Sequence, residues 1–185
     1  MAISPVDREL MNGLKAQQPK ALENLYDCYG GMMYGLAFKI LGDRQEAEDL
    51  IQDIFLKLWQ TCTYDPERGT LQSFLLLLVR SRALDRLRSR KSRFNRVEQF
   101  EHQILSETSK HFPLDAVASD EISQRVQDAL IALPEKQRKA LELSYFGGFS
   151  QQEIANLLEV PLGTVKSYFR LSFNKLRQAL QDLVH

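Results

Sequence analysis

The stretch Phe149–Arg170 constrains the fold of this chain more than any other part of the sequence. Ser150 is followed three residues later by Glu153, a capping-box pattern that starts a helix. Pro161 and Gly163 mark the turn that leads into a second helix. The first helix has one apolar face, formed by Ile154, Ala155, Leu157 and Leu158. The pattern predicts two short helices joined by a tight turn.

The second of these helices has the layout of a surface for duplex DNA. Val165 is expected to pack back on the first helix, which leaves polar and basic side chains outward. These outward residues are Thr164, Lys166, Ser167 and Arg170, and Lys175 continues the basic series. A helix-turn-helix places its second helix in the major groove, where such cations meet phosphates. From the pattern alone, an ordinary helical hairpin stays open as the alternative.

Charge is arranged in blocks of opposite sign, although the formal net charge is +0. Residues 1–73 carry 7 basic and 11 acidic side chains, and residues 74–96 carry 8 basic and 1 acidic. Residues 97–133 carry 2 basic and 7 acidic side chains, and residues 134–185 carry 7 and 5. Blocks of this kind predict separate binding partners better than the total does.

Helical periodicity runs through nearly the whole chain and predicts an all-α protein. Three helices are expected at residues 20–41, about 46–60 and about 71–93, with a loop at residues 61–70. Residues 94–119 are polar, acidic and weakly periodic. We therefore expect two small helical domains, at residues 1–93 and 120–185, joined by a flexible linker at 94–119.

The second domain should contain two more helices before the helix-turn-helix. The first begins near Asp120. Pro134 fits the first position of the next helix, because its missing N–H is unused there. That helix should turn Ala140, Leu141 and Leu143 inward.

A dense basic run occupies the second half of the helix at residues 71–93. Its cations are Arg80, Arg82, Arg86, Arg88, Arg90, Lys91, Arg93 and Arg96, interrupted by Asp85. Neighbouring arginines repel one another unless an anion lies against them, which favours nucleic-acid phosphate. An RNA-binding or membrane-surface arm is the rival. Tyr64 and Phe74 precede the run, and their rings suit stacking on unpaired bases. The alternative is that both rings lie in the core.

Several classes of function are not indicated. Cys28 and Cys62 have neither metal-ligand nor disulfide spacing, which is typical of reduced thiols in a cytoplasmic protein. The longest apolar run, Phe74–Val79, is too short to insert into a membrane. No catalytic constellation, metal cluster or phosphate loop is recognisable. We expect no enzymatic activity, cofactor, metal or small-molecule substrate.

Three motifs, in this order and spacing, resemble the small sigma factors of bacterial RNA polymerase, the extracytoplasmic-function group of the sigma-70 family. The first is AEDLIQDIFLKLW at residues 47–59. The second is YDPERGTLQSF at residues 64–74 followed by RSRALDRLR at residues 80–88. The third runs from LPEKQR at residues 133–138 through GTVKS at residues 163–167 to KLR at residues 175–177. The resemblance covers about residues 20–92 and 122–180.

The resemblance implies roles for particular residues. The acidic helix is similar to the surface that docks on the polymerase clamp, with Glu46, Glu48, Asp49, Gln52 and Asp53. The basic helix and the loop before it are similar to the part that melts and captures the minus-ten element. Its residues would be Tyr64, Phe74, Arg80, Ser81, Arg82, Arg86, Arg88, Arg90 and Lys91. The reader of the minus-thirty-five element would use Thr164, Lys166, Ser167, Arg170 and Lys175.

The resemblance therefore implies a promoter-specificity subunit that binds core RNA polymerase and promoter DNA in a stress or envelope response. It also implies an anti-sigma partner that hides the polymerase-facing surfaces. The alternative is a free-standing helix-turn-helix regulator that binds duplex DNA as a dimer. Such a regulator would need neither an acidic docking helix nor a basic strand-opening helix.

Overall fold

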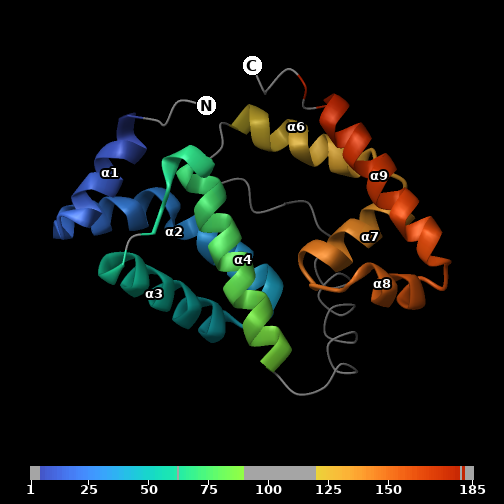
Figure 1. Ribbon diagram of the computed structural model, residues 1–185, viewed down its shortest axis with the longest axis horizontal. Helices are drawn as coiled ribbons and strands as arrows, with labels where there is room; N and C mark the ends of the chain where they lie inside the picture. Colours follow the sequence, from blue (N-terminus) through green and yellow to red (C-terminus); the bar gives the residue numbers. More distant parts are fainter. Residues whose placement is uncertain (1–4, 62, 90–119, 180, 182–185) are drawn as a thin grey trace. The chain divides into compact units, whose positions relative to one another are not determined.

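The computed structural model describes residues 5–61, 63–89, 120–179 and 181, and gives the backbone alone for residues 120–124. The chain divides into two compact units, Met1–Gln99 and Phe100–His185. The described parts of both units are helical and contain no strand (Figure 1). The all-α prediction is confirmed. The linker predicted at residues 94–119 and its boundaries lie outside the described residues and stay a prediction.

The described residues of the first unit form four α-helices and one short 3₁₀ turn. They are α1 (Pro5–Lys15), α2 (Pro19–Leu41), α3 (Arg44–Gln60), η1 (Pro66–Arg68) and α4 (Leu71–Ser89). Gly42 ends α2 in the left-handed region, with φ 70, and its N–H donates to the carbonyl of Phe38 at 2.8 Å. Asp43 then caps α3 by accepting from the Glu46 N–H at 2.9 Å. Both helix boundaries were predicted from these residues.

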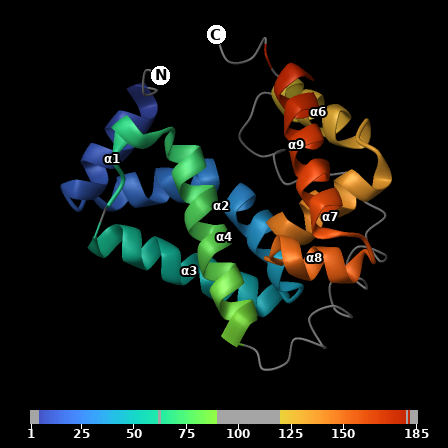
Figure 2. The ribbon, with the colours of Figure 1, turned by 45° about the vertical axis from the view of Figure 1, so that its right-hand side comes forward.

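Helix α2 forms the centre of the first unit. It contacts α1, α3 and α4, and both ribbon views show α4 crossing in front of it (Figures 1 and 2). Its side chains Leu25, Met33 and Leu36 are at most 1% exposed. From α4, Leu75 and Val79 are fully buried as well. Apolar burial against one shared helix therefore places α3 and α4 in the same unit.

Helix α1 was not singled out in the sequence. It packs on α2 through Leu10, Met11 and Leu14, which are all buried. The two helices approach so closely that a Cβ on Gly13 would lie 2.6 Å from the Cβ of Ala21. A glycine is therefore needed at this crossing.

The second unit contains α6 (Asp120–Ile131), α7 (Glu135–Tyr145), α8 (Gln151–Leu157) and α9 (Leu162–Ala179). Helix α9 contacts each of the other three. The core is formed by Leu130, Leu133, Ala140, Leu143, Phe146, Phe149, Ile154, Ala155 and Val165. Leu141, Leu157 and Leu158, which were expected on the apolar faces of their helices, are half-buried.

Helices α8 and α7 begin directly after the residues that the sequence indicated, Ser150 and Pro134. The Ser150 hydroxyl accepts from the Glu153 N–H at 3.3 Å, and the Ser150 N–H donates to the Glu153 carboxylate at 2.9 Å. The capping box is therefore confirmed. Pro134, in contrast, lies one residue before the first helical position, with φ −54 and ψ 141. Its own N–H is absent, but its carbonyl begins the helical hydrogen bonds by accepting from Arg138 at 3.0 Å.

A hydrogen bond connects the outer helix α1 to the centre of the first unit. The Tyr29 hydroxyl donates to the Asp7 carboxylate at 2.6 Å. Burial, and secondarily this bond, raises the pKa of Tyr29 above its ordinary value of 10.0. In alkaline solution the phenol of the unfolded chain ionises first, so the contribution of Tyr29 to stability falls as the pH rises above 10.0.

We expect Tyr29→Phe to lower the free energy of unfolding by about 1 kcal/mol, because the ring packing stays and one hydrogen bond is lost. The alkaline loss of stability should become smaller in this variant. Denaturant unfolding of the full chain at neutral and alkaline pH measures both effects. Tyr34→Phe is the matched control, since among the described residues Tyr34 has a ring contact with Phe38 and no hydrogen bond. Equal stability of the two variants would contradict the role assigned to Tyr29.

Candidate functional site

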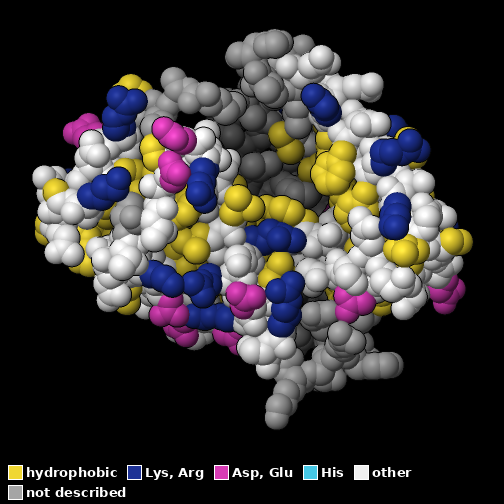
Figure 3. Space-filling view, in the orientation of Figure 1, with side chains coloured by type: hydrophobic (Ala, Val, Ile, Leu, Met, Phe, Trp, Pro, Cys, Tyr) yellow, Lys and Arg dark blue, Asp and Glu magenta, His cyan; other side chains and the backbone are white. Residues whose placement is uncertain are grey.

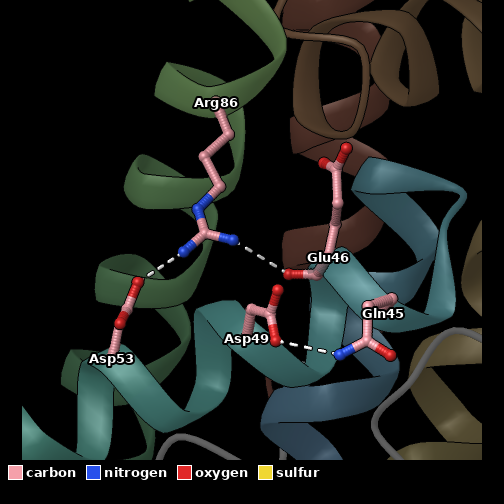
Figure 4. Close-up of polar contacts among 5 residues, drawn as sticks. All are labelled: Gln45, Glu46, Asp49, Asp53 and Arg86. Carbon is pink, nitrogen blue, oxygen red and sulfur yellow. Dashed lines mark hydrogen bonds and ion pairs between the residues drawn. The ribbon is translucent and has the colours of Figure 1, made fainter.

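The outward face of α3 is acidic. Glu48, Asp49, Gln52 and Asp53 are exposed, whereas Glu46 is half-buried. The opposite face is apolar and buried, through Ala47, Leu50, Ile51, Ile54, Phe55 and Leu58. The Asp49 carboxylate accepts from Gln45 Nε2 at 3.1 Å, one turn before it (Figure 4). The structure thus brings the predicted acidic residues together on one helix face, which we call the acidic face.

One apolar residue that lies on the acidic face was not predicted from the sequence. Leu56 is 58% exposed, although it lies between the buried Phe55 and the buried Leu58. It follows Asp49 by seven residues and Gln52 by four, so all three share one side of the helix. The helical spacing from Asp49 was the signal that could have identified it. Single exposed apolar residues are common on protein surfaces, so Leu56 is notable for its place among the carboxylates.

Arg86 lies differently from the prediction. Its Nη1 donates to the backbone carbonyl of Glu46 at 3.0 Å, and its Nη2 contacts the Asp53 carboxylate at 2.5 Å. Figure 4 shows the guanidinium reaching from α4 across to α3, while the Glu46 side chain points away from it. The Arg86 side chain is 31% exposed and that of Asp53 is 67% exposed. Arg86 was predicted to face DNA, but here it joins the two helices.

Two other cations of α4, Arg82 and Arg88, are exposed, as is Ser81. Arg80 is half-buried, like Arg86. Arg88 forms a loose pair with Asp85, with 3.4 Å between Nη1 and Oδ1. In the view of Figure 3, basic and acidic side chains gather together over α3 and α4. Arg90 and Lys91, which were also predicted to bind DNA, lie outside the described residues.

The two aromatic candidates differ in exposure. Tyr64 is 7% exposed, and its hydroxyl donates to the Gly69 carbonyl at 2.9 Å. Burial raises the pKa of Tyr64. Its ring packs against the half-buried Phe74, with 5.4 Å between ring centroids. For Tyr64 the structure therefore supports the core alternative, because a buried and hydrogen-bonded ring has no free face for a base. Phe74 keeps part of its ring accessible.

The predicted recognition helix is α9. Lys166, Arg170 and Lys175 are exposed, and Thr164 and Ser167 are half-buried. The Ser167 hydroxyl donates back to the Gly163 carbonyl at 2.9 Å. Val165 is fully buried, as expected for the residue that packs on α8. The polar and basic side chains therefore share a surface that is anchored by Val165.

Apolar side chains extend the exposed surface of α9. Leu171 is 42% exposed and Phe173 is 58% exposed. The Phe173 ring contacts that of Phe169, with 6.2 Å between centroids. Helix α9 therefore presents apolar area beside its cations.

The described residues contain no group of three or more His, Cys, Asp or Glu side chains placed to hold a metal ion. Within the same residues, no helix is both long enough and apolar enough to cross a membrane.

Two sigma-factor family models match this chain. The family model for sigma-70 region 2 matches residues 25–93, which include α3 and α4. The model for sigma-70 region 4 matches residues 123–176, which include α8 and most of α9.

Curated relatives match nearly the whole chain. The ECF RNA polymerase sigma factor SigK of Mycolicibacterium vanbaalenii is 31% identical over 172 residues, or 92% of this chain and 87% of that protein. SigK of Mycobacterium tuberculosis is 30% identical, with 92% and 91% covered.

Solved structures with similar chains include CnrH in complex with the cytosolic domain of CnrY. That chain is 22% identical, with 97% of this chain and 99% of that chain covered and a TM-score of 0.41. The family models and the curated relatives decide the family. The chain belongs to the extracytoplasmic-function sigma factors of the sigma-70 family, which are promoter-specificity subunits of bacterial RNA polymerase.

Proposed function

We propose that this sigma factor divides its work among three surfaces. The acidic face of α3 docks on core polymerase, the exposed cations of α4 hold the melted minus-ten strand, and α9 reads the minus-thirty-five duplex. The observation that carries the proposal is the arrangement on α3, where four polar residues and Leu56 share one exposed side of a helix whose other side is buried. The buried side holds α3 in the unit, while its other side presents charged residues to a partner.

Docking through α3 requires a partner surface that is basic and partly apolar. Asp49 and Asp53 supply the negative charge, which steers association and sets orientation. Leu56 supplies an apolar anchor at the end of the acidic face. Such an anchor contributes affinity, whereas exposed charges contribute mostly specificity and rate.

Minus-ten capture would depend on Arg82, Arg88 and Phe74, with Ser81 beside them. Cations hold the phosphates of a single strand, and an aromatic ring stacks on its bases. The exposure of Arg82 and Arg88 and the half-exposure of Phe74 support this role. Arg80 lies on the same helix and is half-buried.

Minus-thirty-five reading would depend on Lys166 and Arg170, with Thr164, Ser167 and Lys175 as polar and phosphate contacts. A recognition helix uses its N-terminal residues for base edges and later residues for the backbone. Leu171 lies one residue beyond Arg170, and an apolar side chain there can contact the methyl group of thymine.

In this proposal the chain has no catalytic activity of its own, because core polymerase performs RNA synthesis. It acts in the cytoplasm, where polymerase and promoter DNA are found. A free-standing regulator is the less favoured alternative, since the match to sigma-70 region 2 covers the acidic and basic helices of the first unit, in addition to the region 4 match in the second unit. Transcription in vitro from a responsive promoter, with core polymerase in the presence and absence of this chain, tests the proposal.

The first variant to test is Asp49→Arg. We expect it to weaken binding to core polymerase at least about tenfold, because a reversed charge faces a basic partner surface. The fold should be unaffected, since Asp49 is exposed and bonds only to Gln45 one turn away. Glu9→Arg on α1 is the control, an equal charge reversal at an exposed site outside α3. Unchanged affinity of Asp49→Arg in a titration would rule out the acidic face as the docking site.

The second pair of variants separates the two DNA surfaces. Arg170→Ala should reduce promoter use and change the preferred upstream sequence, because one good base contact is worth about 1–3 kcal/mol. Arg88→Ala with Arg82→Ala should leave the upstream preference unchanged and impair strand opening. Permanganate reactivity of thymines near the start site measures opening, and a promoter library measures preference. The same defect in both variants would refute the division of labour.

We also propose control by a separate anti-sigma protein that covers the polymerase-facing surfaces. The exposure of the acidic face in the isolated chain supports external sequestration. The purified chain should therefore activate core polymerase at once, without proteolysis or modification. A purified chain that stays inactive until it is cleaved would indicate self-inhibition instead.

A further inference from the structure

The half-buried Arg86 is placed among residues that the resemblance assigns to DNA, yet its contacts are with α3. We infer that Arg86 is a positioning residue for the polymerase-docking face, and that it does not contact the melted DNA strand. This inference rests on the proposed docking function of α3. It divides the basic run of α4 into cations that face DNA and one cation that supports the neighbouring helix.

The geometry of the contact explains how one side chain can hold two points on α3. Glu46 and Asp53 are seven residues apart, or about two helical turns. The Glu46 carbonyl points toward the C-terminus of the helix, whereas the Asp53 side chain leans toward the N-terminus. The two oxygens therefore converge, and the fork of Arg86 reaches both, at 3.0 Å and 2.5 Å. Lysine has no such fork and would act as a point charge.

The consequence for docking is preorganisation. An exposed aspartate on a helix samples several rotamers, and a partner that binds it must restrict them. The contact with Arg86 selects one orientation of Asp53 before the polymerase arrives, while 67% of the Asp53 side chain stays exposed. The second contact, to the backbone, holds the first turn of α3 against α4. Arg86 thereby fixes both the direction of the carboxylate and the position of the helix.

A DNA role for Arg86 would require these contacts to break. A guanidinium that already donates to a carboxylate and a carbonyl would exchange two charge-assisted hydrogen bonds for one phosphate. Arg82 and Arg88 are exposed and need no comparable rearrangement, because the pair between Arg88 and Asp85 is a loose surface pair at 3.4 Å. Phosphate binding should therefore use Arg82 and Arg88.

Two measurements on the full chain distinguish these roles. The first is the affinity for core polymerase, and the second is the salt dependence of holoenzyme binding to a promoter with a premelted minus-ten region. We expect Arg86→Ala to weaken core binding about tenfold, the size of one charge-assisted hydrogen bond, and to leave the salt slope unchanged. Arg88→Ala should do the opposite, reducing the slope by about 0.7 for one lost single-strand phosphate.

Arg86→Lys keeps the charge and removes the fork. If Arg86 positions α3, this variant should also weaken core binding, with the salt slope again unchanged. The effect of Arg86→Ala should shrink in an Asp53→Asn background, because the contact partner is already altered. Circular dichroism and thermal unfolding of each variant establish that α3 and α4 are folded at the assay temperature, and Arg86→Lys provides the comparison if Arg86→Ala unfolds.

The outcomes separate this inference from the proposed function. A reduced salt slope in either Arg86 variant would make Arg86 a DNA contact and overturn the inference. Normal core affinity of both Arg86 variants, with weakened Asp49→Arg, would overturn the inference and keep the docking face. Normal core affinity of Asp49→Arg would remove the docking face itself, and the positioning role with it.

Discussion

The buried side of α2 is the constraint on which the first unit depends. Leu25, Met33 and Leu36 are at most 1% exposed, and burial of each such side chain contributes about 1.5–3 kcal/mol. Because α3 and α4 both pack on this helix, a helix with an acidic outer face and a helix with a basic second half come to lie in one small unit. Because their apolar sides are buried against α2, the charged sides of α3 and α4 face outward from the same unit.

One ion pair of this unit, between Arg86 and Asp53, joins two helices. The contact of Arg86 with Asp53 and with the Glu46 carbonyl joins residues that are 33 and 40 positions apart. A surface pair in full solvent would contribute little to stability. Here the arginine is half-buried and makes two contacts, so its main effect is on the orientation of α3.

In the second unit, α8 and α9 are each fixed by a contact that the sequence predicted. The capping box of Ser150 and Glu153 starts α8, and Val165 anchors α9 in the core. Exposed Leu171 and Phe173 add apolar area to α9 beside its cations. In the proposed reading of the upstream element, such apolar side chains would contact thymine methyl groups.

The sequence by itself determined the helical class, most helix boundaries, the helix-turn-helix and the two sets of charged residues. These features depend on caps, glycines and apolar spacing, which act within one or two turns of the chain. Only the tertiary structure decided that Tyr64 belongs to the core, that Leu56 is exposed on the acidic face, and that Arg86 reaches α3. The physical reason is that burial and long-range contacts depend on which helix lies across from a side chain, and that is set by the packing of α2, α3 and α4 rather than by neighbouring residues in the sequence.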